Sequence, residues 1–348
     1  MLAHKRARKN KVYKNEIIDF EINLENNITN LLHNIQSKKY RLGTYKTFKI
    51  YEPKERVIKA LPYVDRIVHQ WYVEEFIKPY ILPRFINNTF ACIPNRGTHK
   101  AVDTVQQYLK SYQHINPNFW ILKCDISKFF YNINPHILYD IMKKYISDKE
   151  LLNFTKLLIF DGRNKEECVA IPIGNYTSQF FANIYLNELD QYVKRILKVK
   201  YYVRYMDDFI LLLDSKKMCI KILNDIEIFL EKNLQLKLND KSRYYPNKMG
   251  VNFCGYRIFS THRLLRLNSK KNIKKKVKKW NHLYLHNKLN LNHCMLSLNS
   301  WKGHANHCNS YKLQQKVFNS CYFLYNTNAF KKIENDLIFD LYNFKEEV

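Results

Sequence analysis

The sequence lacks several features that would place it in common protein classes. It has no apolar run approaching the roughly 18 residues of a membrane span, so we expect no membrane segment. The eight cysteines are scattered and include no CxxC pair, which favours reduced thiols. The basic first ten residues contain no apolar signal-peptide segment, so we expect a cytoplasmic protein. No repeat is visible, which argues against a solenoid.

Acidic residues are scarce relative to basic ones. The chain has 31 Asp and Glu against 58 Lys and Arg, for a formal net charge of +27. Such an excess opposes compaction unless a polyanion neutralises it. We therefore expect a nucleic acid as partner, with an affinity that falls steeply as salt rises. The alternative is a basic protein with an evenly solvated surface, but several acidic residues fall inside apolar runs.

The length and the apolar pattern indicate a globular α+β protein. The 348 residues suffice for two or three domains, and 46% of them are hydrophobic. Strands and helices alternate without a regular βαβ rhythm, which favours α+β over a doubly wound sheet. We expect a basic helical extension over 1–50, a mixed body over 51–262 and a basic helical unit over 263–348.

The spacing of apolar residues predicts the main elements. Pro62 is expected to open one helix, which Pro79 and Pro83 should end. Helices are predicted over 20–35, 62–77, 92–109 (after a glycine turn), 134–146, 148–160, 174–197 and 218–233, and strands over 119–126, 200–214 (as a hairpin) and 252–259.

Two adjacent aspartates interrupt the apolar stretch YVRYMDDFILLL. Asp207 and Asp208 lie at the expected hairpin turn, and Asp125 ends the strand expected over 119–126. Carboxylates that meet in this way repel one another, and divalent metal ions would resolve the repulsion. A bare Asp-Asp pair is also common in an ordinary β-turn. The apolar arms on both sides favour the metal site, because a turn in solvent needs no such support.

YMDD with a distant aspartate at a strand end resembles the reverse transcriptases. Further segments resemble their motifs in the family's order: RVIKALPYVDRIVHQ (56–70), FACIPNRGTHKAV (90–102), ILKCDISKFFYNI (121–133), IPIGNYTSQFFANIYL (171–186), LKLNDKS (236–242) and NFCGYRIF (252–259). The resemblance implies a right-hand polymerase fold. Fingers and palm, with an antiparallel palm sheet carrying the YMDD hairpin, would occupy 51–262, and a helical thumb would occupy 263–348.

The resemblance also implies catalytic roles. Asp125 and Asp207 would be the main ligands of two Mg²⁺ ions, with Mn²⁺ as a substitute. Asp208 would support them, and the carbonyl of Ile126 would complete a site. Two such ions activate an attacking 3′-hydroxyl and stabilise the leaving pyrophosphate.

Other matched positions imply contacts with the incoming nucleotide. Phe130 would stack under the sugar and exclude a 2′-hydroxyl, although a core aromatic is the alternative. Lys59, Arg66 and Arg96 would grip the triphosphate, and Lys241 would protonate pyrophosphate. For each of these four cations, a solvated or nucleic-acid-facing charge remains open.

Two departures from the commonest pattern resemble the enzymes of diversity-generating retroelements. Ile173 replaces a glutamine before Gly174, and Gln179 replaces a proline after the serine. The Ser-Trp-x-Gly-His-x-x-His pattern within 300–313 resembles the thumb of the same subgroup. That subgroup copies a template-repeat RNA into cDNA and misincorporates opposite adenines. The resemblance implies a basic, pentameric accessory protein as partner, together with template RNA, a cDNA or primer strand and dNTPs. It also implies a bacterial or phage-encoded enzyme.

The incoming base is expected to pack against the loop at Gly174–Gln179, so Ile173, Gly174 and Gln179 are predicted nucleotide contacts. Loss of an amide at residue 173, which could hydrogen-bond near the nascent pair, is our hypothesis for relaxed discrimination.

The basic C-terminal unit holds the expected nucleic-acid contacts. A lysine-rich stretch over 270–279 is either a solvated helix face or a duplex-binding helix, and nearby aromatics favour the second. The predicted contacts are Lys270, Lys271, Lys274, Lys275, Lys278, Trp301, His304 and His307. Zinc is an alternative for the His and Cys residues of 293–308, but their spacing matches no common finger.

Three other functions compete with the retroelement assignment. Reverse transcriptases of group II introns or of antiphage defence systems are neighbouring alternatives, although little chain remains after the thumb for a DNA-binding or endonuclease domain. A non-catalytic RNA-binding relic is the third. The intact Asp125, Asp207 and Asp208 argue against the relic.

Overall fold

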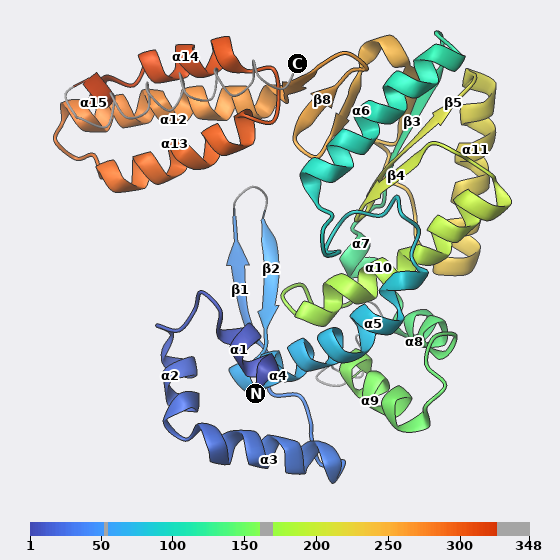
Figure 1. Cartoon of the computed structure of the whole chain (residues 1–348), viewed down its shortest axis with the longest axis vertical. Coiled ribbons are helices and arrows are strands. Elements are labelled where there is room, and N and C mark those ends of the chain that lie inside the picture. The colour runs from blue at the N-terminus through green and yellow to red at the C-terminus, as the bar shows by residue number, and fades with distance from the viewer. Residues whose placement is uncertain (52–54, 161–169, 326–348) are drawn as a thin grey trace. The chain divides into compact units, whose positions relative to one another are not determined.

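The computed structural model describes residues 1–51, 55–160 and 170–325, which form two compact units (Figure 1). Unit 1 comprises residues 1–101 and 116–246, and unit 2 comprises residues 102–115 and the described part of 247–348. Cys168 and residues 326–348 of the expected thumb lie outside the described residues. The domain boundaries expected from composition stay predictions.

Unit 1 is built on a four-stranded antiparallel sheet in the order β4–β5–β3–β6 (Figure 1). Its strands are β3 (Trp120–Asp125), β4 (Tyr202–Tyr205), β5 (Asp208–Leu213) and β6 (Arg243–Pro246). The predicted hairpin is confirmed as β4 and β5, joined by a turn at Met206 and Asp207. After Asp208, β5 is apolar and buried along its whole length.

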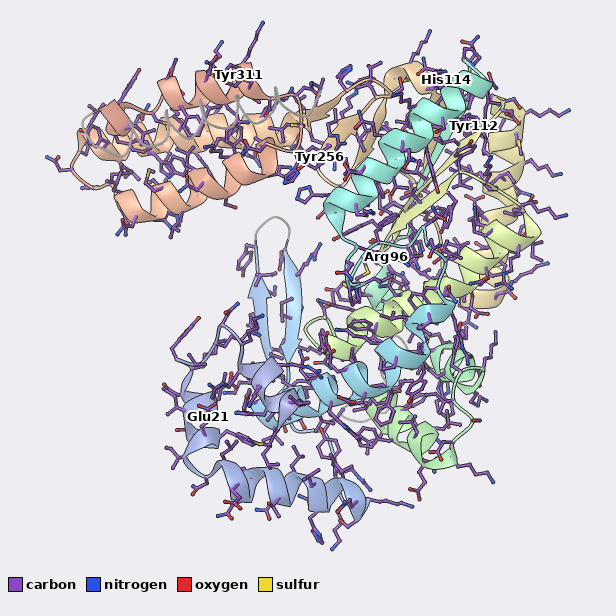
Figure 2. All side chains as sticks on the ribbon, in the orientation of Figure 1. Glu21, Arg96, Tyr112, His114, Tyr256 and Tyr311 are labelled. Carbon is purple, nitrogen blue, oxygen red and sulfur yellow. The ribbon has the colours of Figure 1, made fainter. Side chains whose placement is uncertain are left out.

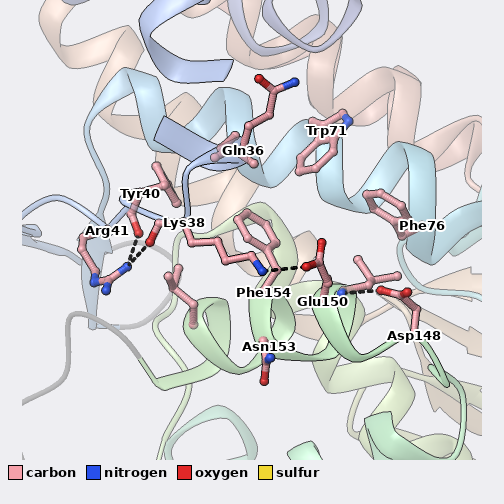
Figure 3. A pocket seen from close by; sticks show the side chains of 13 residues that line it. Gln36, Lys38, Tyr40, Arg41, Trp71, Phe76, Asp148, Glu150, Asn153 and Phe154 are labelled. Atoms are coloured by element: carbon pink, nitrogen blue, oxygen red, sulfur yellow. Dashed lines mark hydrogen bonds and ion pairs between the residues drawn. The ribbon is translucent and has the colours of Figure 1, made fainter. Parts of the chain in front are cut away.

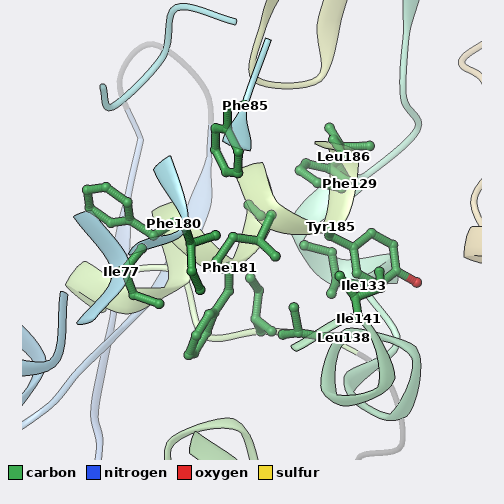
Figure 4. Packing of buried hydrophobic residues seen from close by; sticks show 14 of the residues in the cluster. Ile77, Phe85, Phe129, Ile133, Leu138, Ile141, Phe180, Phe181, Tyr185 and Leu186 are labelled. Atoms are coloured by element: carbon green, nitrogen blue, oxygen red, sulfur yellow. The ribbon is translucent and has the colours of Figure 1, made fainter. Parts of the chain in front are cut away.

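The helix α10 (Tyr176–Gln191) lies in the centre of the hydrophobic core of unit 1. The other helices in the body are α7 (Phe129–Asn132), α8 (Pro135–Lys143), α9 (Lys149–Phe160) and α11 (Lys216–Phe229), which confirms the predicted helices there. Twelve of the 16 residues of α10 are buried, as expected of a central helix. Figure 4 shows Phe180, Phe181 and Tyr185 of α10 among the side chains of this core. The helix α11 packs against the sheet, where it contacts β3, β5 and β6.

Two predicted helices end in π-helical turns. Helix α10 continues into η3 (Tyr192–Ile196), and α11 continues into η4 (Leu230–Leu234). A third π-helical turn, η1 (Val73–Ile77), follows α4 (Tyr63–Tyr72).

The expectation that Pro79 ends the helix opened by Pro62 is wrong. The helical path runs on through η1 into α5 (Lys78–Tyr80) and then into η2 (Leu82–Arg84). Pro79 is the second residue of α5 and follows the π-helical turn closely. Its ring fixes φ near about −65°, which is a helical value, so the path continues although Pro79 donates no hydrogen bond.

The N-terminal segment forms three helices instead of one predicted over 20–35. These are α1 (Leu2–Arg8), α2 (Asn15–Ile22) and α3 (Leu24–Gln36). Asn23, with φ −121° and ψ 44°, separates α2 from α3. The side-chain amide of Asn27 donates to the carbonyl of Phe20 at 3.0 Å, so the break leaves that carbonyl bonded.

A hairpin that sequence reasoning missed precedes α4. It consists of β1 (Lys46–Ile50) and β2 (Arg56–Ala60), paired antiparallel. All five residues of β1 are exposed, so the strand carries no apolar alternation from which it could be recognised.

Unit 2 combines part of α6 (Thr98–Ile115) with a small sheet and a helical bundle. Its remaining elements are η5 (Asn247–Met249), β7 (Val251–Phe253), β8 (Tyr256–Ile258), β9 (Arg263–Leu265), α12 (Leu267–Leu285), α13 (Leu291–Ala305), α14 (Tyr311–Asn319) and α15 (Tyr322–Tyr325). The strands form one antiparallel sheet, and the bundle packs around its own core, which includes Ile273, Val277 and Leu298.

The single strand predicted over 252–259 is wrong. Cys254 and Gly255 form a tight turn with positive φ values of +45° and +91°, and this turn separates β7 from β8. Cys254 is therefore a half-buried turn residue, whereas Cys124 of β3 is fully buried.

Within the described ranges, none of the helices combines the length and the apolar content that a membrane crossing requires.

Candidate active site

The aspartates singled out by the sequence lie on adjacent strands of the unit 1 sheet. Asp125 ends β3 and Asp208 begins β5, and the two are direct partners in the antiparallel ladder. Directly opposed residues hold their Cβ atoms about 5 Å apart. Asp207 precedes Asp208 in the turn, where Met206 has a positive φ of +56°. The fold thus brings Asp125 to the same end of the sheet as Asp207 and Asp208, although Asp125 and Asp207 are 82 residues apart in sequence.

A lysine of the same sheet holds Asp208. Lys123 Nζ donates to both carboxylate oxygens of Asp208, at 2.6 Å each. Lys123 lies two residues before Asp125, so both side chains leave the same face of β3. Burial raises the pKa of Asp208 to about 6, while the charge of Lys123 opposes this rise and those of Asp125 and Asp207 add to it. Asp208 therefore has its counter-charge within the sheet.

Asp207 lies in the field of its acidic neighbour. Burial raises the pKa of its carboxyl, and the charge of Asp125 raises it further. The positive charges of Arg56 and Arg204 act in the opposite direction. The mutual repulsion of these carboxylates is the kind that a bound dication relieves.

The donor set suits a hard cation that keeps part of its water shell. In the described part of the chain, no three His, Cys, Asp or Glu side chains converge as a ready metal cage, and the oxygens of Asp208 are turned to Lys123. The remaining donors are the carboxylates of Asp125 and Asp207 and the carbonyl of Ile126. Mg²⁺ commonly uses one or two carboxylates, water and substrate phosphates, so these residues fit it.

The segment 236–242 supports the end of β3 through its backbone. Asn239 N–H donates to the Asp125 carbonyl at 2.7 Å, and Ser127 N–H donates to the Lys237 carbonyl at 2.9 Å. Lys241 lies in the same segment, where its N–H donates to the side chain of Asn239. Lys241 thus belongs to a segment that is bonded to the backbone at the end of β3, and its predicted contact with pyrophosphate stays a prediction.

Phe130 lies beside the loop that the sequence assigned to the incoming base. Its ring is half-buried against Phe129, with ring centroids 5.5 Å apart, and its carbonyl accepts from Ile171 N–H at 3.0 Å. The next residues of the loop reach β2, because Lys59 N–H donates to the Ile173 carbonyl at 2.9 Å. Three predicted nucleotide contacts, Phe130, Lys59 and Ile173, thus lie along one continuous stretch of backbone bonds.

Gly174 sits where only glycine fits closely. Its φ is +132°, and an added Cβ would lie 2.6 Å from the carbonyl oxygen of Lys59. The loop can therefore approach β2 this closely only without a side chain at this position.

Gln179 and Arg96 lie at the segment over 86–96. Cys92 Sγ donates to the side-chain oxygen of Gln179 at 3.3 Å. Arg96, labelled in Figure 2, donates to the carbonyls of Ile86 and Thr89 at 2.9 and 2.7 Å. Its guanidinium therefore holds the loop in shape, and its grip on a triphosphate stays a prediction.

Arg66 also has a partner within the chain. It forms an ion pair with Glu16 of α2, and its guanidinium lies 5.5 Å from the ring centre of Tyr63. A triphosphate at Arg66 would share the cation with this carboxylate, so the predicted role stays a prediction.

Comparison with protein families decides the class of this fold. Residues 46–258, more than half of the chain, match the family described as reverse transcriptase (RNA-dependent DNA polymerase). The chain belongs to the reverse transcriptase family. Members of this family are RNA-directed DNA polymerases and generally depend on divalent metal ions. The matched residues include all three aspartates and Lys123.

The relatives found for this reverse transcriptase include an intron protein and telomerases. The putative COX1/OXI3 intron 2 protein of Saccharomyces cerevisiae is 26% identical, and the match covers 49% of this chain and 27% of that protein. The chain thus spans about a quarter of that relative. Neither it nor the structural neighbours below come from a diversity-generating retroelement, so the subgroup stays a prediction.

A solved structure of low sequence identity shows the same fold. Telomerase from Candida albicans, in complex with a TWJ fragment of telomeric RNA, superposes with a TM-score of 0.51 at 13% identity, over 89% of this chain and 60% of that one. Apo telomerase from Candida tropicalis, truncated from its C-terminal domain, gives a TM-score of 0.47 at 14% identity, over 69% of this chain and 60% of that one.

The predicted nucleic-acid contacts of unit 2 fall into two groups. On α12 the side chains of Ile273, Val277 and Trp280 face the core, so the lysines lie away from that face. Lys271, Lys274, Lys275 and Lys278 are exposed, and Lys270 is half-buried.

The second group consists of Trp301, His304 and His307 of unit 2, and the first two of these are packed within the unit. Tyr256 Oη lies 2.9 Å from Nδ1 of His304 and donates to its carbonyl at 2.8 Å, and Gly255 leaves room for the imidazole ring. Trp301 is half-buried with its indole nitrogen enclosed, whereas His307 is exposed. The Trp-x-Gly-His pattern thus joins α13 to the turn between β7 and β8, which its predicted nucleic-acid role did not anticipate.

Sequence reasoning missed four residues at the aspartates. Lys123 and Arg204 are charged residues inside apolar strands, a signal that was available because buried charges need partners. Arg56 and Asp190 offered no such signal. Arg56 lies on the unrecognised strand β2, and Asp190 looks like one of several polar residues on a helix.

A separate hollow of about 480 Å³ lies between α3, α4 and α9, and its lining does not include Asp125, Asp207 or Asp208 (Figure 3). Trp71, Phe76 and Phe154 line it. Two cations on its rim are engaged, because Lys38 pairs with Glu150 and Arg41 donates to backbone carbonyls. Its aromatic lining suits an apolar group better than a triphosphate.

Proposed function

We propose that this reverse transcriptase copies an RNA template into cDNA by metal-dependent nucleotidyl transfer at Asp125 and Asp207. The observation that carries the proposal is the direct ladder pairing of Asp125 with Asp208, with Asp207 in the adjoining turn. In this proposal the four-stranded sheet is the palm, the β1–β2 hairpin belongs to the fingers, and the helices of unit 2 form the thumb.

We assign the metal to Asp125, Asp207 and the Ile126 carbonyl, with Asp208 in support. Bound Mg²⁺, or Mn²⁺ in its place, supplies charge for the attacking hydroxyl and the leaving pyrophosphate. The chain itself contributes alignment: the backbone bonds from 236–242 fix the end of β3, and Lys123 keeps the carboxylate of Asp208 in one orientation.

The nucleotide would lie between Phe130, the 171–179 loop and β2. Phe130 would exclude a 2′-hydroxyl, and Ile173, Gly174 and Gln179 would border the incoming base. Lys59, Arg66 and Arg96 are assigned to the triphosphate side, and Lys241 to the pyrophosphate. Support for this placement comes from the hydrogen bonds that join Phe130 to Ile171 and Lys59 to Ile173.

For the biological setting we propose a diversity-generating retroelement. Ile173 and Gln179, together with the Ser-Trp-x-Gly-His-x-x-His pattern, support that subgroup. The enzyme would copy a template-repeat RNA with errors opposite adenines, for mutagenic retrohoming, and would bind a basic pentameric accessory protein. The same proposal places the enzyme in the cytoplasm of a bacterium, encoded either by the bacterium or by a phage.

A second candidate is an intron-type reverse transcriptase. The similarity to the intron 2 protein of Saccharomyces cerevisiae supports it. The two candidates differ in fidelity, so an adenine-rich RNA template separates them. A retroelement enzyme should misincorporate opposite adenine far more than opposite the other bases, whereas equal error rates at all four bases, with the accessory protein supplied, would favour the intron type.

Primer extension tests the reaction itself. The purified chain, an RNA template, a primer, dNTPs and Mg²⁺ should yield cDNA, and Asp207→Ala should abolish synthesis while RNA binding persists. Asp214→Ala, at the exposed far end of the same hairpin, is the matched control and should retain synthesis. Synthesis by Asp207→Ala would refute the assignment, and inactivity of the wild type with partner present would favour an RNA-binding relic.

The role of Ile173 is tested on the same adenine-rich template. Ile173→Gln restores an amide beside the nascent pair without removing the backbone bond to Lys59. Our proposal expects fewer errors at adenine, since a hydrogen bond of about 1–3 kcal/mol would again assist discrimination. An unchanged error rate at adenine would exclude this explanation.

A further inference from the structure

A fully buried ion pair lies directly behind the turn that carries Asp207. Arg204 of β4 and Asp190 of α10 both have fully buried side chains. The guanidinium binds the carboxylate with two parallel bonds, Nε to Oδ1 at 2.7 Å and Nη2 to Oδ2 at 2.6 Å. Tyr202 and Thr89 donate one further bond each to Asp190, both at 2.7 Å. Four donated bonds thus fix this carboxylate.

The remaining nitrogen of Arg204 reaches the turn itself. Nη1 donates to the carbonyl of Met206 at 3.0 Å and to the side-chain oxygen of Asn183 at 3.1 Å. Met206 has a positive φ of +56°, a conformation that residues other than glycine adopt at a cost. The residue held in this way is the one immediately before Asp207.

The backbone of Arg204 extends the network to a second segment. Arg204 N–H donates to the carbonyl of Asn88 at 2.9 Å, and Phe90 N–H donates to the carbonyl of Arg204 at 3.1 Å. Asn183 adds a bond from its side-chain amide to the carbonyl of Ala91 at 2.8 Å. One buried arginine therefore ties together α10, the loop over 88–91 and the turn.

Stability alone does not account for such a pair. Burying two charges is costly, and apolar residues of similar volume often replace a buried pair without loss of stability. The guanidinium of Arg204, held by two parallel bonds to Asp190, directs a hydrogen-bond donor at one backbone carbonyl, which an apolar side chain does not do. The only part of the network that adjoins a predicted metal ligand is the bond to Met206.

We propose that Arg204 is a positioning residue: held by Asp190, it fixes the turn at Met206 so that the carboxylate of Asp207 faces Asp125. The inference rests on the proposed function in one respect, namely that Asp207 binds the metal. Arg204 itself touches neither substrate nor metal in this assignment.

The test uses the full chain and Arg204→Lys, which keeps the charge but loses the fork. We expect the variant to fold, to retain its KM for dNTP and to lose kcat. Its affinity for Mn²⁺, measured by electron paramagnetic resonance without nucleotide, should fall about 10- to 100-fold, as is usual when a group that orients a metal ligand is lost. The matched control is Glu188→Gln, on the same helix as Asp190, which removes the surface ion pair between Glu188 and Lys144.

A second variant keeps the test decisive if Arg204→Lys unfolds. The double change Arg204→Met with Asp190→Leu replaces the buried pair by apolar side chains and should fold. It should show the same loss of Mn²⁺ affinity. Wild-type Mn²⁺ affinity and kcat in either folded variant would overturn the inference and leave the pair a structural feature.

Asp207→Ala separates this failure from a failure of the proposed function. If Asp207→Ala loses Mn²⁺ affinity while the Arg204 variants keep it, only the positioning role is refuted. If Asp207→Ala also keeps wild-type affinity, then Asp207 is not a ligand and the proposed function fails with it.

Discussion

Lys123 and Asp208 form a two-pronged ion pair across neighbouring strands, with Nζ 2.6 Å from each carboxylate oxygen. The pair lies on the face of β3 that also carries Asp125. One of the three aspartates is thus neutralised by the chain itself, which leaves Asp125 and Asp207 as the carboxylates that most need an external cation. Because Lys123 acts through charge, its effect can be measured by titration.

Removing that charge should raise the pKa of Asp208. The metal-free protein should titrate Asp208 near its pKa of about 6, and Lys123 lowers that pKa. We expect the midpoint to move to higher pH in Lys123→Met, as followed by ¹³C NMR of the carboxyl group. Lys123→Arg keeps the charge and serves as the control. A midpoint that stays in place in Lys123→Met would show that Lys123 is not the counter-charge.

His69 should make the protein less stable in mild acid. The imidazole is buried in unit 1, its Nδ1 lies 2.8 Å from Thr177 Oγ1, and burial lowers its pKa to about 3. Between pH 6.5 and 3 the unfolded chain binds a proton at this position that the folded protein does not. Stability therefore falls as pH falls through that window, by about 2 kcal/mol from pH 7 to pH 5.

Urea unfolding at the two pH values measures this effect. His69→Gln should lose about 2 kcal/mol of the pH dependence, whereas His293→Gln, at an exposed position of α13, should retain it. The same pH dependence in His69→Gln and wild type would show that His69 does not contribute.

Gly174→Ala should uncouple the 171–179 loop from β2. Gly97 is a matched control, because its φ of +136° is close to the +132° of Gly174 but nothing lies within 4 Å of its added Cβ. Both alanines carry backbone strain of about 1–3 kcal/mol, and only Gly174→Ala adds the collision with the Lys59 carbonyl. We expect a raised KM for dNTP in Gly174→Ala alone. Equal KM values in the two variants would refute the proposed role of the contact.

Phe130→Val should weaken the discrimination between dNTP and rNTP. A smaller side chain leaves room for the 2′-hydroxyl, so single-turnover incorporation of rNTP should rise by an order of magnitude or more, while dNTP incorporation changes little. Phe129→Leu is the control, because Phe129 is buried in the core and its change should lower stability without altering the preference. Unaltered discrimination in Phe130→Val would support the alternative of a core aromatic.

The sequence revealed most of the body of the fold, because long apolar periodicities specify α10, α11 and the β4–β5 hairpin. It failed where local bonds override the pattern. Asn23 divides a predicted helix, the start of α5 accommodates Pro79, and the turn at Cys254 and Gly255 divides a predicted strand. The β1–β2 hairpin escaped notice because β1 is exposed on both faces.

At the candidate site, the sequence identified the aspartates but not the charged residues that hold them. The three aspartates stood out because carboxylates in apolar segments need a reason. Their partners Lys123 and Arg204 are visible in the same segments, but which carboxylate each one binds depends on strand register and on the distant residue Asp190. Such pairings follow from three-dimensional packing, which a single sequence does not contain.

The apolar character of β5 has a consequence for how the strands find their alignment. In most sheets a slip by one residue turns the hydrophobic side chains toward water, and that penalty keeps the strands in step. From Phe209 to Leu213 every residue of β5 is buried, so a slipped strand would look equally apolar from either side. Two charged pairs near the start of β5, Asp208 with Lys123 and Arg204 with Asp190, then distinguish the correct register from a slipped one. The residues that specify the register during folding are therefore those nearest the candidate active site.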